Sequence, residues 1–198
     1  MESIVSNINK IRDKEQKKAL NNWAITGFNG SIIAGTGFGK SRCAILACNY
    51  ILENVVNSKI HILVPTIQLQ DQFIDEFHKW DLENCLDNVE ILCYQSAYKL
   101  KSNQYDLVVC DEIHLGLSPQ YRKFFENNTY NKLLCMTATL PEEEEYKHLL
   151  GMIAKSLGWD INRVTGRVTE LVNLGMVTSN GTHKDKQTNR TVTVWKAL

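Results

Sequence analysis

The first candidate functional feature of this chain is a glycine-rich segment that ends in lysine and serine. It reads Ala34-Gly35-Thr36-Gly37-Phe38-Gly39-Lys40-Ser41. Glycines let the backbone curl tightly enough for several N–H groups to point at one anion. An apolar strand at 31–33 precedes the segment and a helical pattern follows it to about Leu52, so the positive end of a helix faces the same anion. The segment predicts a phosphate-binding loop.

The polar side chains of this loop indicate a nucleoside triphosphate with magnesium. Lys40 is a mobile positive charge that can reach the β- and γ-phosphates, and the Ser41 hydroxyl can ligate Mg²⁺. The residues that we expect to contact the nucleotide are Thr36, Gly37, Phe38, Gly39, Lys40 and Ser41. The usual form of the loop begins with glycine, whereas this chain has Ala34.

A pair of carboxylates follows a second apolar strand. Asp111-Glu112-Ile113-His114 comes directly after 107–110, a run suited to a buried parallel strand. Asp111 would emerge where magnesium sits, and Glu112 can be aimed at the attacking water, as base or orienter, once the chain turns. Each motif by itself also fits an ordinary solvated loop. Their order, each behind an apolar strand, favours a triphosphate site.

The order of these and further motifs resembles the first motor domain of superfamily 2 helicases, in the Asp-Glu-x-His group, over residues 10–150. That family tolerates alanine at the head of the loop. The resemblance implies ATP and Mg²⁺ as cofactors, with Gln16 reading the adenine edge from a segment that starts at Arg12. It implies Ser41 and Asp111 as magnesium ligands. The catalytic group that it implies is Lys40, Asp111, Glu112 and His114.

The same resemblance implies nucleic-acid contacts and coupling residues. The strands at 62–66 and 91–96 are similar to family motifs whose loops touch the nucleic-acid backbone. Their contact residues would be Thr66, Gln95 and Ser96. Thr137-Ala138-Thr139 resembles the motif that links hydrolysis to domain movement, so Thr137 and Thr139 would be coupling residues, with His114 near Thr137.

The pattern of apolar runs predicts the fold independently of the motifs. Runs at 31–33, 60–64, 89–93, 107–110 and 132–136 alternate with longer amphipathic segments. This alternation favours an α/β fold with a doubly wound parallel sheet, of the RecA-like type found in phosphate-loop NTPases. The loops at the carboxyl ends of its strands carry Lys40, Thr66, Asp111 and Thr137, where open α/β sheets place ligands.

We expect two domains, a motor domain at 1–150 and a smaller one at 151–198. The helicase family builds its catalytic site between two motor domains, and the second donates arginine fingers. The last 48 residues are too few for a second motor domain. Hydrolysis by the chain alone is therefore expected to be slow and autonomous unwinding is not expected, unless a second motor domain in trans or self-association supplies the arginine.

The region 151–198 predicts a small winged helix-turn-helix domain that binds DNA. It holds seven Lys or Arg against three Asp or Glu, whereas the preceding part is net acidic. Helical patterns at 153–158 and 161–174 have helix-turn-helix spacing, and 176–178 and 191–195 fit two strands of a wing. The outward residues expected at DNA are Asn162, Arg163, Arg167, Lys184, Lys186 and Arg190. Such domains are common in phage and bacterial proteins. The same face also fits a protein contact or a solvated surface.

The six cysteines have no Cys-x-x-Cys spacing and fall mostly in apolar runs, so we expect buried free thiols. The chain shows no signal peptide and no apolar run long enough to cross a bilayer. We therefore expect no membrane contact and a cytoplasmic location, in the host cytoplasm if the protein is viral.

Three functions remain open. The favoured one is a nucleic-acid-stimulated ATPase or helicase module. The second is a DNA-binding regulator or adaptor whose motor half binds nucleotide but hydrolyses it poorly. The third is a truncated helicase remnant, against which the intact Lys40, Ser41, Asp111 and Glu112 argue.

Overall fold

The computed structural model describes residues 4–138, 177–184 and 191–197. The chain divides into two compact units, Met1–Leu157 and Gly158–Leu198, which are considered separately. The helices predicted at 153–158 and 161–174 lie outside the described residues. So do Thr139, Asn162, Arg163, Arg167, Lys186 and Arg190.

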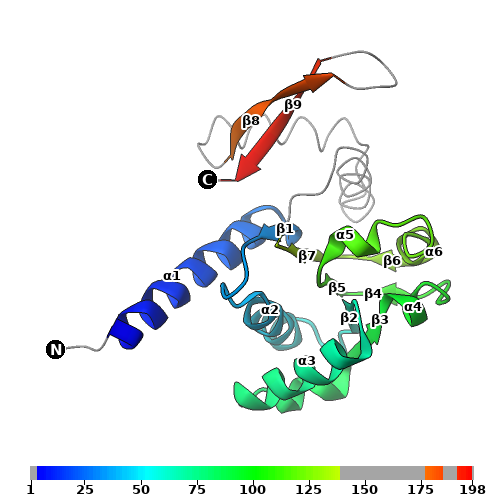
Figure 1. Ribbon diagram of the computed structural model, residues 1–198. Coiled ribbons are helices and arrows are strands. Elements are labelled where there is room, and N and C mark those ends of the chain that lie inside the picture. Colours follow the sequence, from blue (N-terminus) through cyan, green and yellow to red (C-terminus); the bar gives the residue numbers. More distant parts are fainter. Residues whose placement is uncertain (1–3, 139–176, 185–190, 198) are drawn as a thin grey trace. The chain divides into compact units, whose positions relative to one another are not determined.

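A five-stranded parallel sheet forms the centre of the first unit (Figure 1). Its strand order is β1-β7-β5-β2-β3 and every neighbouring pair is parallel. The strands are β1 (Asn29–Ile33), β2 (Ile60–Val64), β3 (Val89–Cys93), β5 (Leu107–Cys110) and β7 (Leu133–Thr137). The predicted α/β fold with a parallel sheet is confirmed.

Side-chain alternation along the strands divides the core into two clusters, one on each face of the sheet. Along β5, Leu107 and Val109 belong to one cluster, while Val108 and Cys110 belong to the other. The three inner strands β2, β5 and β7 are buried at every residue. Continuous apolar runs are what a parallel sheet covered on both faces requires.

Long helices cover the first face and short ones the second. The first cluster packs under α1 (Ile4–Ile25), α2 (Lys40–Asn54) and α3 (Ile67–Lys79), with the 3₁₀ helix η1 (Glu83–Asn88) beside them. The second packs under α4 (Tyr94–Ala97), α5 (Ile113–Gly116) and α6 (Lys123–Asn127). A two-stranded parallel pair, β4 (Gln104–Tyr105) and β6 (Thr129–Tyr130), adjoins the second cluster.

Two local predictions need correction. The segment at Gln95 and Ser96 was expected to be a loop, but it forms the single helical turn α4, because Tyr94 and Ala97 bury one side of that turn in the second cluster. The N-terminal segment is part of a helix of 22 residues, which the motif at Arg12–Gln16 did not reveal. Trp23 anchors this helix, since its indole N–H donates to the Leu133 carbonyl at 2.9 Å.

The second unit contains an antiparallel pair, β8 (Val177–Lys184) and β9 (Thr191–Ala197). Two strands were predicted here, but the first was expected to end at 178 and to leave Lys184 in the connection. Lys184 instead pairs with Thr191 as the last residue of β8. The pairing continues past a register shift between Ser179 and Thr182, and a bulge of this kind lets a strand extend through a polar stretch.

All six cysteines are buried free thiols, as predicted. Among the described residues, no helix is long and apolar enough to span a bilayer.

Candidate functional site

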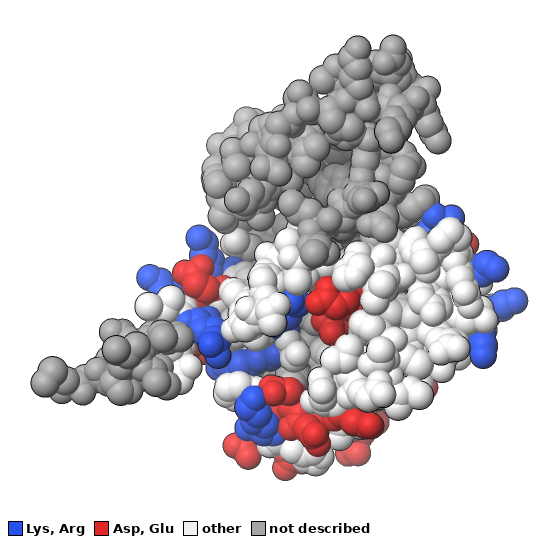
Figure 2. All heavy atoms as spheres, viewed as in Figure 1, with Lys and Arg blue, Asp and Glu red and all other residues white. Residues whose placement is uncertain are grey.

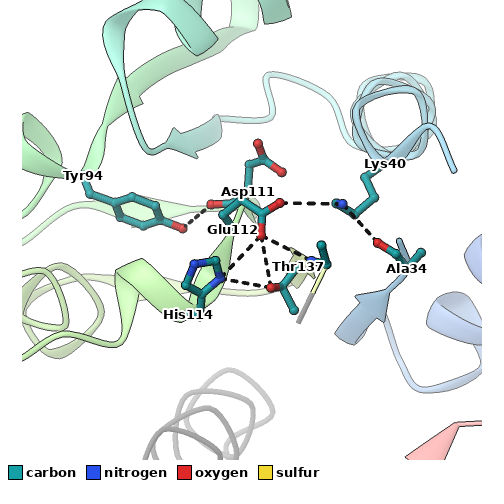
Figure 3. Close-up of polar contacts among 8 residues, drawn as sticks. Ala34, Lys40, Tyr94, Asp111, Glu112, His114 and Thr137 are labelled. Carbon is teal, nitrogen blue, oxygen red and sulfur yellow. Dashed lines mark hydrogen bonds and ion pairs between the residues drawn. The ribbon is translucent and has the colours of Figure 1, made fainter. Parts of the chain in front are cut away.

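The predicted phosphate loop and the predicted carboxylate pair meet at the carboxyl edge of the parallel sheet (Figure 3). The loop follows β1, Asp111 follows β5, and Thr137 ends β7, which lies between those two strands. The Ala34 N–H donates to the Thr137 carbonyl at 3.0 Å, which fixes the start of the loop against β7. Topology thus brings together residues that are about 100 positions apart in the chain.

The loop backbone needs glycine at two positions. Gly37 and Gly39 have φ of 84° and 87°, in the left-handed region that side chains with a Cβ disfavour. Gly39 immediately precedes the first turn of α2. A Cβ placed on Gly35 or Gly37 would meet no atom within 4 Å, so the outer side of the loop is open. This is the room that a phosphate chain would require.

Lys40 lies where the loop becomes helix, and its side chain is only 12% exposed. Its Nζ donates to the Ala34 carbonyl at 3.1 Å and lies 3.6 Å from Oε1 of Glu112 (Figure 3). Ser41 follows in the first turn of α2 and is half-buried. Thr36 is exposed at the tip of the loop, while Phe38 packs against the first core cluster.

Asp111 directly follows β5 and is 8% exposed. Burial, together with the neighbouring charge of Glu112, raises its pKa to about 6, and the positive charge of Lys40 opposes this shift only in part. Two main-chain hydrogen bonds hold the residue in place. Its N–H donates to the Leu63 carbonyl at 2.8 Å, and its carbonyl accepts from the Tyr94 hydroxyl at 2.9 Å. A carboxylate that is buried beside a second carboxylate favours a cation next to it.

Glu112 turns the chain in a strained conformation, with φ 46° and ψ 57°. Non-glycine residues in this region cost energy and concentrate at functional sites. The turn directs the carboxylate toward β7 and the phosphate loop. Its Oε2 accepts from the Thr137 hydroxyl at 3.1 Å and from the Ala138 N–H at 3.3 Å, while its Oε1 faces Lys40.

His114 completes this cluster. Its Nδ1 lies 3.1 Å from the Thr137 hydroxyl oxygen and 3.4 Å from Oε2 of Glu112. Because the Thr137 hydroxyl donates its proton to Glu112, its oxygen accepts from His114, which assigns a proton to Nδ1. The predicted proximity of His114 and Thr137 is therefore present in the structure, with Glu112 as their common partner.

The donor set fits magnesium held together with phosphates. Mg²⁺ usually keeps several waters and takes one or two protein ligands beside phosphate oxygens. The two predicted ligands, Ser41 at the start of α2 and Asp111 directly after β5, match that number. Among the described residues, no group of three or more His, Cys, Asp or Glu side chains could hold a metal ion.

The residues predicted to touch nucleic acid lie on separate elements. Thr66 caps α3, where its hydroxyl accepts from the Leu69 N–H at 3.3 Å, and it is exposed. Gln95 and Ser96 are exposed on α4. Figure 2 shows Lys and Arg atoms in several separate groups on the face that it presents, rather than in one continuous basic field.

Sequence reasoning missed the environment of Gln16. Its side chain is 1% exposed and contacts the phosphate loop directly, and Arg42, the residue after the predicted magnesium ligand, holds its other end. Arg42 also forms an ion pair of 2.8 Å with Asp13. The adjacency of Arg42 to the loop was the only signal in the sequence.

The solved structures that share the fold include three helicase or ATPase domains. The Pyrococcus furiosus Hef helicase domain has a TM-score of 0.57 at 16% identity, over 71% of this chain and 36% of that one. The Sulfolobus solfataricus SWI2/SNF2 ATPase core in complex with dsDNA has a TM-score of 0.59 at 14% identity, over 83% and 39%. The UvsW helicase from bacteriophage T4 has a TM-score of 0.55 at 21% identity, over 69% and 55%.

The chain thus spans between 36% and 55% of the length of these three proteins. No curated protein matches it. The fold is that of helicase and ATPase cores, as the motifs had indicated. The family model described as "Type III restriction enzyme, res subunit" matches residues 9–142, and the chain belongs to that family.

Proposed function

We propose that the chain is the ATP-binding module of a nucleic-acid-dependent ATPase of helicase type. The observation that carries the proposal is the contact of Glu112 with both Lys40 and Thr137, at the edge where the phosphate loop meets β5 and β7. This contact unites the residues that would bind phosphate, activate water and respond to hydrolysis. The family match over residues 9–142 supports the same class.

The residues would divide the chemistry among them. Lys40 would leave the Ala34 carbonyl and Glu112 to contact the β- and γ-phosphates. Ser41 and Asp111 would hold the Mg²⁺ that neutralises phosphate charge. Glu112 would then be free to orient the attacking water or accept its proton, because its partner Lys40 has moved to phosphate.

His114 and Thr137 would respond to changes in the hydrogen bonding of the Glu112 carboxylate. Both contact the same Glu112 oxygen, so a change in the hydrogen bonding of this oxygen would alter the contacts of Thr137 at the end of β7. Thr139 would continue the path toward domain movement.

Nucleic acid would be contacted from both domains, 1–150 and 151–198. In the motor domain we propose Thr66, Gln95 and Ser96, which are exposed. In the C-terminal domain we propose a DNA-binding winged helix, of which β8 and β9 would form the wing. Its contacts would be Asn162, Arg163, Arg167, Lys184, Lys186 and Arg190. A second motor domain in trans, or self-association, would supply the arginine finger.

The test is ATP binding and steady-state hydrolysis by the purified chain, with and without duplex and single-stranded DNA. Lys40→Ala and Glu112→Gln are the matched controls, since the first removes the phosphate contact and the second removes the base. DNA-stimulated turnover that both variants lose would support the proposal. Tight ATP binding without turnover would favour a nucleotide-regulated DNA-binding protein, and no ATP binding would contradict the proposal.

A further inference from the structure

Three tyrosines from two separate segments form a row of ring contacts at α4. Tyr94 and Tyr121 are stacked, with ring centroids 5.8 Å apart and an angle of 21° between the planes. Tyr121 also contacts Tyr98, at 6.0 Å and 45°. Tyr94 is 1% exposed, whereas Tyr98 and Tyr121 are half-buried. The row therefore begins in the second core cluster and ends at the surface.

The backbone on both sides of the row is held by hydrogen bonds. The Tyr98 N–H donates to the Tyr94 carbonyl at 3.2 Å, which closes the turn of α4. The Tyr121 N–H donates to the Ser118 hydroxyl at 3.4 Å, and its carbonyl accepts from the Phe124 N–H at 3.0 Å. The two outer rings are thus placed before any ligand arrives, so a ligand that stacks on them bears little of the cost of ordering side chains.

The surroundings of the two outer rings are basic. The segments 94–102 and 117–123 contain no Asp or Glu, and they carry the exposed lysines Lys99, Lys101 and Lys123. Nζ of Lys99 lies 5.8 Å from the ring centroid of Tyr98. Positive charge attracts a phosphate backbone, and flat aromatic rings offer a surface on which bases stack. Together they favour a polyanion that also carries aromatic groups.

The two rings also adjoin the proposed nucleic-acid contacts of the motor domain. Gln95 and Ser96 are exposed on α4, and Tyr98 follows Ser96 by two residues, at the end of the same helical turn. A strand whose backbone lies along Gln95 and Ser96 has its bases free to reach the neighbouring rings.

We propose that Tyr98 and Tyr121 form a stacking surface for the bases of single-stranded nucleic acid. The bases of a duplex are already paired and stacked, so an unpaired strand is the form that offers a free base face. Every base has such a face, and the surface therefore distinguishes unpaired from paired strands without reading sequence. This inference rests on the proposed nucleic-acid-dependent function.

The test compares two short single strands of equal length and charge. One is an oligothymidylate, and the other is an abasic strand with the same sugar-phosphate backbone but no bases. Kd is measured with the full chain by fluorescence anisotropy at one salt concentration. Stacking of a base on an aromatic side chain raises affinity about 5- to 150-fold, so the wild type should bind the oligothymidylate more tightly by a factor in that range.

Four variants separate the ring from the rest of the surface. Tyr98→Leu keeps apolar bulk but removes the flat ring, so it should lose most of this preference while the Kd for the abasic strand stays the same. Tyr98→Phe keeps the ring and should retain the preference. Tyr50→Leu removes a tyrosine that is 45% exposed on α2 and serves as the matched control. Lys99→Gln should weaken binding of both strands by the same factor, because it removes a charge that attracts phosphate.

The outcomes distinguish the inference from the function on which it rests. Equal Kd values of the wild type for the two strands would overturn the inference and leave the proposed function standing, since backbone contacts would then account for binding. Equal losses for both strands in Tyr98→Leu would assign Tyr98 to the structure of α4 and would also overturn it. If the folded wild-type chain bound neither strand nor duplex DNA, the proposed function itself would fail, and the inference with it.

Discussion

The Tyr94 hydroxyl donates a hydrogen bond of 2.9 Å to the main-chain carbonyl of Asp111 (Figure 3). Tyr94 is 1% exposed, and its ring packs so closely on Gly116 that a Cβ there would lie 2.6 Å from the Tyr94 Cε1. The next residue along the chain is Gln95, a proposed nucleic-acid contact. A rigid side chain therefore joins that contact to the backbone of a proposed magnesium ligand.

We predict that Tyr94→Phe uncouples nucleic acid from hydrolysis. Loss of the hydroxyl leaves the Asp111 carbonyl without this donor, so only the hydrogen bond from its N–H to the Leu63 carbonyl still holds the backbone of this proposed magnesium ligand. DNA stimulation of ATP turnover should fall about 3- to 10-fold, while the Kd for ATP stays within twofold and unfolding free energy drops by about 1 kcal/mol. Tyr98→Phe, four residues further on, is the matched control. Equal stimulation in both variants would rule this coupling route out.

Thr137 should act through its hydroxyl rather than its bulk. Thr137→Ala removes the donor to Glu112 and the acceptor for His114, so hydrolysis should fall about 10- to 100-fold, which corresponds to the loss of a hydrogen bond to a charged group. Thr137→Ser keeps the hydroxyl and should retain most of the rate. Single-turnover rates at saturating ATP measure the effect. Similar rates for the alanine and serine variants would contradict it.

Two glycines of the same loop should differ in their tolerance of alanine. Gly39→Ala meets both a left-handed backbone and the Gln16 amide, so it should lower unfolding free energy by about 1 to 3 kcal/mol. Gly35→Ala places its Cβ in open space and should change stability by less than about 0.5 kcal/mol. Urea denaturation of the two variants beside the wild type checks this contrast. Equal losses would show that the loop backbone is not constrained as described.

His61 should make stability sensitive to acid. It is fully buried on β2 against Tyr105 and Phe124, and burial, helped by the charge of Lys59, lowers its pKa from 6.5 to about 4. Its Nδ1 lies 3.2 Å from Oε2 of the exposed Glu90, but neither ring nitrogen forms a hydrogen bond among the described residues. The native state therefore keeps the ring neutral where the unfolded chain takes up a proton.

Because the folded state disfavours the protonated ring, the contribution of His61 makes the protein less stable as the pH falls. Stability from His61 is fully present above pH 6.5 and is lost as the pH falls toward 4, by up to about 3 kcal/mol. His61→Leu should remove this part of the pH dependence, so the gap in unfolding free energy between variant and wild type should change across that interval. Denaturation curves from pH 7.5 to 4 measure the unfolding free energy of both proteins. Because all other titrating groups are present in both, their contributions cancel when the two values are subtracted at each pH. A constant gap would show that the buried ring carries no such penalty.

The sequence alone determined the sheet and the place of the site. The strands at 60–64, 89–93 and 107–110 were predicted with the bounds that the structure has, because continuous apolar runs between polar segments are a local signal for buried parallel strands. The carboxyl ends of parallel strands lie at the same edge of the sheet. The sequence therefore predicted that Lys40 and Asp111 lie at that common edge. Glycines at 37 and 39 marked the loop because their positive φ is a property of single residues.

Only the tertiary structure decided how the side chains of this site are connected. The bonds of Gln16 to the loop, of Tyr94 to Asp111 and of Glu112 to Thr137 each join elements that are distant in the chain. Their existence depends on the directions of side chains and on the left-handed turn at Glu112. Motif spacing carries no information about such directions, because they are set by packing between helices and sheet after the chain has folded.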